Sequence, residues 1–210
     1  MFIEKFDKHL NYFKRNHSTS FKLEEGFGKV LISAPHSTTH VRDGKTLFSE
    51  PHVGAIAKLL HEDLGCPIIY KSANCGDDPN FDLPSPYKDA IVQYVKDHDV
   101  QCVLDLHQLS PKRPCCVDIG TNSFANVFDL RHYEILDGAL KQFLACPIFT
   151  DTLFKSSMPQ RISTFVANAC KVSCFQIEFQ SNLFKPTSSD FNAEGVYNAL
   201  AQTIRIINEN

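Results

Sequence analysis

The chain has 210 residues, a formal net charge of -3 and 43% hydrophobic residues. This length suits one fairly large domain with a substantial buried core, and nothing in it requires a second domain. Basic residues are scattered rather than clustered, so neither nucleic acid nor an anionic membrane surface is expected as a partner. We expect a small molecule or short peptide instead.

The cysteines and residues 1–20 indicate the cellular compartment in which the protein is expected. Charged residues occur throughout residues 1–20, so we expect no signal peptide there, and no later stretch is long enough to span a bilayer. This pattern predicts a cytoplasmic protein. The eight cysteines are then expected to be reduced thiols, mostly small buried apolar residues, rather than a disulfide framework. The sequence does not indicate an oligomeric state.

Hydrophobic periodicity predicts alternating helices and strands. A peripheral amphipathic helix is expected within residues 1–20. Loops are expected at 35–44 and 72–84. Strands are expected at 29–33, 66–70, 100–107, 115–119, 147–150 and 172–179, and helices at 51–64, 85–96, 129–144, 161–169 and around 196–207. This order predicts one α/β domain over residues 1–210, with three α/β/α layers and a mixed, mainly parallel sheet.

A histidine ends the strand at 100–107. In open α/β sheets the carboxyl ends of the strands form the ligand-binding edge, which places His107 in the expected crevice. Asp105 lies two residues earlier on the same face, where a carboxylate fixes the tautomer of a metal-binding imidazole. Taken alone, His107 is better interpreted as a satisfied core histidine, and Asp105 could be a backbone cap.

Three further stretches direct polar groups toward the same edge. His36 follows the strand at 29–33, Glu50 precedes the helix at 51–64, and Glu178 lies within the apolar strand at 172–179. Two histidines and one carboxylate form a zinc site with an open position for water, and the remaining carboxylate could act as general base or acid. Manganese, iron or cobalt would also accept such ligands.

Each of these residues has a simpler explanation as well. Glu50 could be an ordinary first-turn acid stabilised by the helix dipole, and His40 could be either a further ligand or a solvated loop histidine. Glu178 is the hardest to explain without a function, because a buried carboxylate with no partner is costly.

These stretches resemble known zinc hydrolases. The segment 104–110, Leu-Asp-Leu-His-Gln-Leu-Ser, resembles the strand that carries the third zinc ligand of zinc carboxypeptidases. The segment 32–37, Ile-Ser-Ala-Pro-His-Ser, is similar to the Pro-His-Ser-Gly-type opening of N-formylglutamate amidohydrolases, and 175–178 resembles the strand with their catalytic glutamate. Segments 50–57, 78–82 and 87–88 are also similar to members of that family, and the resemblance covers roughly residues 28–185.

The resemblance implies a carboxypeptidase-like (phosphorylase/hydrolase-like) α/β fold that binds one zinc ion through His36, Glu50 and His107. It implies Glu178 as the general base for attack of metal-activated water on an amide carbonyl, with Asp105 as an orienting group. The implied substrate is a small N-acyl amino acid or a peptide-like amide.

One part of the family pattern is missing. Where the family has an Asn-Arg pair that holds the substrate carboxylate, this chain has Asn80-Phe81. Arg42 is the preferred replacement and Arg161 the second, with Lys155 a further option and Asn80 retained. The missing arginine also leaves an alternative open, a non-catalytic metal- or ligand-binding protein derived from this fold. A thiol-based redox protein using Cys115 and Cys116 is a third hypothesis.

Overall fold

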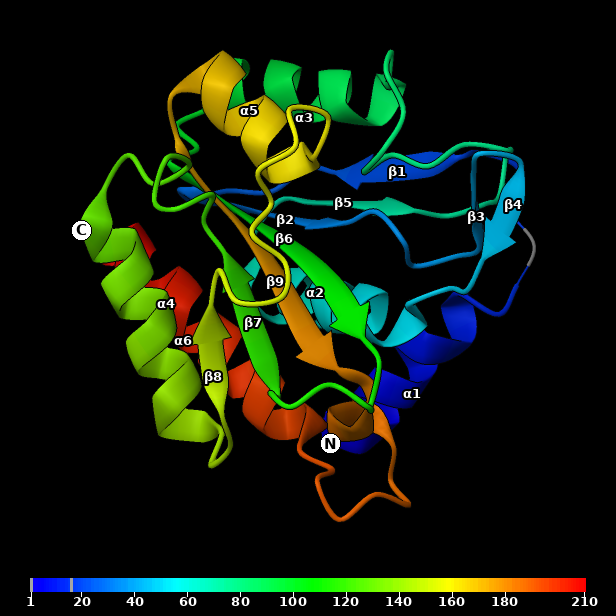
Figure 1. Ribbon diagram of the computed structural model, residues 1–210, viewed down its shortest axis with the longest axis vertical. Coiled ribbons are helices and arrows are strands. Elements are labelled where there is room, and N and C mark those ends of the chain that lie inside the picture. Colours follow the sequence, from blue (N-terminus) through cyan, green and yellow to red (C-terminus); the bar gives the residue numbers. More distant parts are fainter. Residues whose placement is uncertain (1, 16) are drawn as a thin grey trace.

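This computed structural model describes residues 2–15 and 17–210. The described residues form a central seven-stranded sheet (Figure 1). The strand order is β1-β5-β2-β6-β9-β7-β8. β1 is antiparallel to β5 and β7 to β9, whereas the other neighbours are parallel. The mixed, mainly parallel sheet is therefore confirmed. Its strands are β1 (Phe21–Glu24), β2 (Val30–Ala34), β5 (Ile68–Lys71), β6 (Cys102–Leu109), β7 (Val117–Gly120), β8 (Ile148–Thr150) and β9 (Ser173–Gln180).

Helices cover both faces of the sheet and complete three layers. Helices α3 and α5 lie on one face, and α1, α2, α4 and α6 lie on the other (Figure 1). Along β2, Leu31 packs toward the first pair while Ile32 packs toward the second group, as the alternation of a strand requires. The helices are α1 (Phe2–Tyr12), α2 (Pro51–Leu64), α3 (Pro86–Asp97), α4 (Leu130–Phe143), α5 (Ile162–Cys170) and α6 (Ala193–Glu209), with a 3-10 turn, η1, at Ser181–Phe184.

Most expected elements are present, but the prediction of a loop throughout 35–44 was wrong in one respect. It contains β3 (His40–Arg42), which pairs with β4 (Lys45–Leu47) as a hairpin. Asp43 and Gly44 connect the two strands with φ values of 50° and 74°, the positive φ values that a tight hairpin turn needs. The edge strand β1 was also not expected. Its four residues are too few for the alternation to be distinctive.

Two cysteines differ from the expectation of reduced thiols. Cys116 and Cys146 form a disulfide, while the other six cysteines are free. Each of the two bonded cysteines lies just before one of the neighbouring parallel strands β7 and β8, and the Cys116 N–H donates to the carbonyl of Pro147. Cys115 is buried and is not bonded to Cys116, so the structure does not join the vicinal pair. The cytoplasmic location stays a prediction.

Among the described residues, no helix is both long and apolar enough to cross a membrane.

Candidate active site

His36 and Glu50 lie on neighbouring loops that are joined through the backbone. His36 follows β2, Glu50 immediately precedes α2, and the Glu50 N–H donates to the His36 carbonyl at 2.7 Å. Gly54 lets α2 approach this loop, since a Cβ at that position would lie 2.5 Å from Ser37 Oγ. The start of α2 is thus held against the end of β2.

His107 reaches the same place from the centre of the sheet. It lies near the end of β6, which pairs with β2 on one side and β9 on the other. Its Nδ1 is 3.2 Å from His36 Nδ1 and 3.4 Å from Glu50 Oε2. His36 Nδ1 is 3.2 Å from Glu50 Oε1. The three expected metal ligands therefore meet at one point, spaced as a metal-binding group.

A buried aspartate orients each imidazole. His36 Nε2 donates to Asp78 Oδ1 at 2.9 Å, and His107 Nε2 donates to Asp105 Oδ2 at 3.1 Å. Asp105 is the orienting group expected from the sequence. Asp78 falls in the expected loop at 72–84 and in the family-like segment 78–82, and its orienting position was missed. Carboxylates often hold the distal nitrogen of metal-binding histidines in this way.

These hydrogen bonds leave neither imidazole with a proton directed toward the centre. With the protons of both rings on Nε2, the two Nδ1 atoms present bare lone pairs toward each other and toward the Glu50 carboxylate. Such a group of acceptors is favourable only around a cation. Imidazole nitrogens and one carboxylate are ligands that zinc prefers, so the residues present fit a zinc ion.

The local charges favour a cation as well. Burial alone would lower the pKa of His36, but Glu50 and Asp78 raise it above its ordinary value. Burial would lower the pKa of His107 as well, but Asp105 and Glu50 raise it. Burial would raise the pKa of Glu50, yet the two imidazoles hold it well below its ordinary value. The site therefore binds positive charge strongly, as protons or as a metal.

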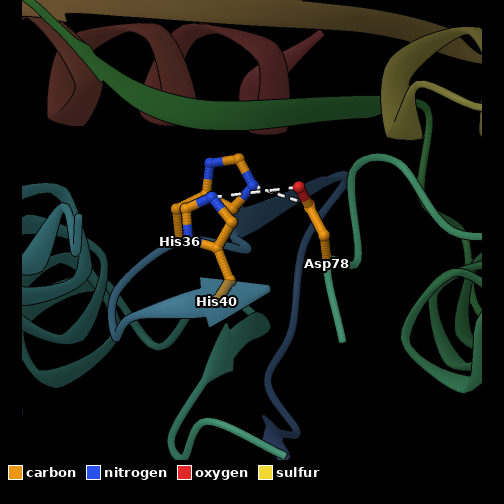
Figure 2. Close-up of side chains that lie close together, drawn as sticks. All are labelled: His36, His40 and Asp78. Atoms are coloured by element: carbon orange, nitrogen blue, oxygen red, sulfur yellow. Dashed lines mark hydrogen bonds and ion pairs between the residues drawn. The ribbon is translucent and has the colours of Figure 1, made fainter. Parts of the chain in front are cut away.

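His40 offers a second ligand set. The rings of His36 and His40 are stacked, with centroids 3.8 Å apart, and both face Asp78 (Figure 2). However, Asp78 already accepts hydrogen bonds from Arg42 Nε and from the Asn80 N–H, besides His36. Its carboxylate is therefore fully engaged, and the set with Glu50 and His107 fits a metal better. Burial lowers the pKa of His40 to about 4, so this ring stays neutral.

Glu178 lies on β9 beside these ligands. It is opposite His107 in the pairing of β6 with β9. Glu178 and the three expected ligands line one cavity, whose volume is about 470 Å³. Burial raises the pKa of Glu178 to about 7. Gln176 Nε2 donates to Glu178 Oε1 at 2.8 Å, which leaves Oε2 for a substrate or water. A carboxyl group with a pKa near neutrality suits proton transfer.

Basic side chains line the same cavity, which we call the arginine cavity. Arg42 lines the cavity and forms an ion pair with Asp78, in which a guanidinium nitrogen lies 2.7 Å from Asp78 Oδ2. Arg161 donates to the Asn80 carbonyl, and in the described part of the chain neither it nor Arg113 nor Lys155 forms an ion pair. The geometry therefore favours Arg161 over Arg42 for binding an anion. Arg113 was missed because the loop after β6 shows no periodicity.

Asn80 lines the arginine cavity and is also hydrogen-bonded within the protein. Its side-chain oxygen accepts from the Ile162 N–H at 2.9 Å and its amide nitrogen is 3.4 Å from His107 Nε2. It is only 2% exposed. Asn80 thus joins the loop after β5 to the start of α5, and thereby helps to place Arg161.

The loop after β8 closes one side of the cavity. Asp118, on β7, accepts hydrogen bonds from the N–H groups of Leu153 and Phe154, both at 2.7 Å. Gly120 gives this loop room, because a Cβ there would lie 2.4 Å from the carbonyl of Phe154. These contacts fix the segment that carries Lys155 over the site.

Solved structures share this fold at low sequence identity. No family model matches the chain, and no curated protein matches it. An N-formylglutamate amidohydrolase from Ralstonia eutropha JMP134 is 13% identical, with a TM-score of 0.62 over 90% of this chain and 98% of that one. A bacteriophage poly-gamma-glutamate hydrolase is 13% identical, with a TM-score of 0.55 over 90% of this chain and 89% of that one. A metallo-carboxypeptidase from Burkholderia cenocepacia is 13% identical, with a TM-score of 0.54 over 97% of this chain and 68% of that one. The carboxypeptidase-like fold expected from the sequence is confirmed.

Proposed function

We propose that this protein is a zinc-dependent hydrolase that cleaves the C–N amide bond of a small N-acyl amino acid or short peptide. The observation that carries the proposal is the meeting of His36 Nδ1, His107 Nδ1 and the Glu50 carboxylate beside Glu178, at the floor of a cavity. The amidohydrolase and carboxypeptidase with the same fold support it.

The proposed roles follow from the geometry. His36, Glu50 and His107 would hold the ion, which when bound supplies Lewis acidity and lowers the pKa of water. The Glu178 carboxylate would accept a proton at Oε2 from water as the water oxygen adds to the amide carbonyl, and would deliver that proton to the leaving nitrogen when the C–N bond breaks. Gln176 keeps Oε1 engaged and so orients the other oxygen. Asp78 and Asp105 hold the imidazoles in the required tautomers.

The unpaired cations indicate the charge of the substrate. Arg161, Arg113 and Lys155 lie in one cavity without a carboxylate partner among the described residues, so the substrate would bring the negative charge. Arg161 would take over the task of the arginine that the family pattern lacks at Phe81. Arg42, engaged by Asp78, would stabilise the metal-orienting aspartate instead.

The test combines metal analysis with a substrate panel. We expect close to one zinc ion per purified chain by elemental mass spectrometry, and hydrolysis of at least one N-acyl amino acid that Glu178→Gln abolishes while zinc content is kept. A protein without stoichiometric metal would refute the proposal. Zinc binding with no turnover on the panel would favour the alternative, a non-catalytic metal- or ligand-binding protein, which the absence of an arginine at position 81 supports.

A further inference from the structure

A second cavity lies beside the proposed zinc ligands. Its volume is about 520 Å³, and we call it the apolar cavity because Phe48, Pro51, Leu109 and Pro111 form much of its lining. Residues common to both cavities are Phe48, Glu50, Gln108, Leu109 and Ser110. The two cavities therefore adjoin at Glu50, one of the proposed ligands. The other proposed ligands, His36 and His107, line the arginine cavity, so the apolar cavity extends away from the centre past Glu50.

The two cavities differ in charge. The arginine cavity holds Arg113, Lys155 and Arg161, whereas the apolar cavity contains no arginine, a single lysine, Lys185, and no carboxylate except Glu50. In an N-acyl amino acid the carboxylate belongs to the amine half of the amide. That half fits the arginine cavity, which leaves the apolar cavity for the acyl half.

Two residues of the apolar cavity, Gln108 and His52, are hydrogen-bonded to each other. Gln108 Oε1 accepts from the His52 N–H and from His52 Nδ1, both at 3.2 Å. An uncharged alkyl group could thus lie against this contact without breaking its hydrogen bonds.

Phe48 stands at the boundary of the two cavities. Its side chain is 94% exposed although it is large and apolar, and it lies just after the β3–β4 hairpin. Contact with an apolar ligand would remove this surface from water. Phe48 therefore offers a side wall for an acyl group that passes the metal centre.

We infer that the apolar cavity is an acyl subsite, and that the substrate carries an alkyl acyl group much longer than formyl. The inference rests on the proposed hydrolase function. A formyl group has one carbon and would leave the 520 Å³ cavity unused. Each methylene buried there adds apolar contact, so affinity should grow with chain length until the cavity is filled.

A binding series tests this without relying on turnover. The zinc-loaded Glu178→Gln variant is titrated by calorimetry with N-acetyl-, N-butanoyl-, N-hexanoyl- and N-octanoyl-L-glutamate. We expect the affinity to rise about threefold for each added methylene that is buried. Equal affinity across the series would overturn the inference.

Two substitutions and one control assign any such rise to this cavity. Ser181 lines it, so Ser181→Trp should reduce the ratio of octanoyl to acetyl affinity to about one, while Ser189→Trp, on the exposed loop nearby, should leave that ratio unchanged. Phe48→Ala removes only an exposed side chain and should lower the same ratio by about threefold or more. If Ser181→Trp and Phe48→Ala both keep the ratio of the parent, as Ser189→Trp should, the alkyl chain binds elsewhere and the inference fails.

The outcomes separate this inference from the proposed function. Turnover of N-formyl or N-acetyl substrates that depends on Glu178, together with a flat binding series, would keep the hydrolase and reject the acyl subsite. A chain-length effect that Ser181→Trp removes, in a protein that hydrolyses nothing, would keep the subsite and reject the hydrolase.

Discussion

His107 and Glu178 lie directly opposite each other in the pairing of β6 with β9. Residues at the same level of neighbouring strands point to the same face and are separated by the spacing of the sheet, about 4.8 Å between strands. A proposed metal ligand and the proposed base are thus positioned by backbone hydrogen bonds at the centre of the sheet. Sites held by regular elements are more precise than sites held by loops.

Removal of His107 should greatly weaken metal binding. His107→Ala leaves Glu50 and His36 as the remaining ligands, so we expect zinc affinity to fall by more than about a hundredfold, beyond the loss usual for an orienting residue. Competition with a fluorescent chelator measures this directly. His132→Ala is the matched control, since His132 is also a buried histidine but lies on α4, away from the site. Equal zinc affinity in the two variants would contradict the ligand assignment.

Asp78 should act through His36. Asp78→Asn removes the charge that holds His36 Nε2–H and Arg42, and we expect zinc affinity to fall about 10- to 100-fold. Asp43→Asn removes the same charge at an exposed turn where asparagine is well tolerated, and it should have no effect on zinc affinity. If both variants bind zinc equally well, Asp78 does not position His36.

The sequence predicted the elements that carry the site because their periodicity is strong. His36, Glu50, His107 and Glu178 each lie in a strand or next to the end of a strand or helix, so the prediction of a parallel sheet was enough to bring them to one edge. The structure confirms that His36, Glu50 and His107 meet, while their binding of a metal stays a prediction.

Residues in long loops could not be placed in the same way. Asp78 lies between β5 and α3, where no regular element fixes its distance from His36. The disulfide depends on β7 and β8 being neighbours, which residues 116 and 146 alone do not reveal. The β3–β4 hairpin did carry a signal, because Asp43-Gly44 is a typical hairpin turn, but its strands of three residues show no clear alternation.

Arg161 should bind the substrate carboxylate. Arg161→Gln should raise KM for an N-acyl amino acid about 10- to 100-fold, since a charge-assisted hydrogen bond is lost, with a smaller effect on the corresponding substrate whose carboxylate is an amide. Arg131→Gln is the control, because Arg131 is exposed and pairs with Asp129 outside the arginine cavity. The melting temperature must be checked, since Arg161 also donates to the Asn80 carbonyl. An equal rise in KM for both substrates would contradict a carboxylate-binding role.

Glu178 should make the metal-free protein less stable as the pH rises. Burial raises its pKa to about 7 in the folded state, so the folded protein binds the proton more tightly than the unfolded chain. Its stabilising contribution is complete below the unfolded pKa of about 4.5 and is lost as the pH rises through about 7. Glu178→Gln cannot ionise at this position, and it keeps an acceptor for Gln176.

The free energy of unfolding of Glu178→Gln, relative to the parent, should therefore increase by about 1–3 kcal/mol between pH 5 and pH 8. Urea titrations in the presence of EDTA at both pH values measure this difference. Because both proteins contain the same histidines, the contribution of histidine titration to the free energy of unfolding cancels in the comparison. Glu134→Gln, at an exposed position on α4, should show the same difference from the parent at both pH values. A constant difference for Glu178→Gln as well would show that Glu178 is not held protonated in the metal-free site.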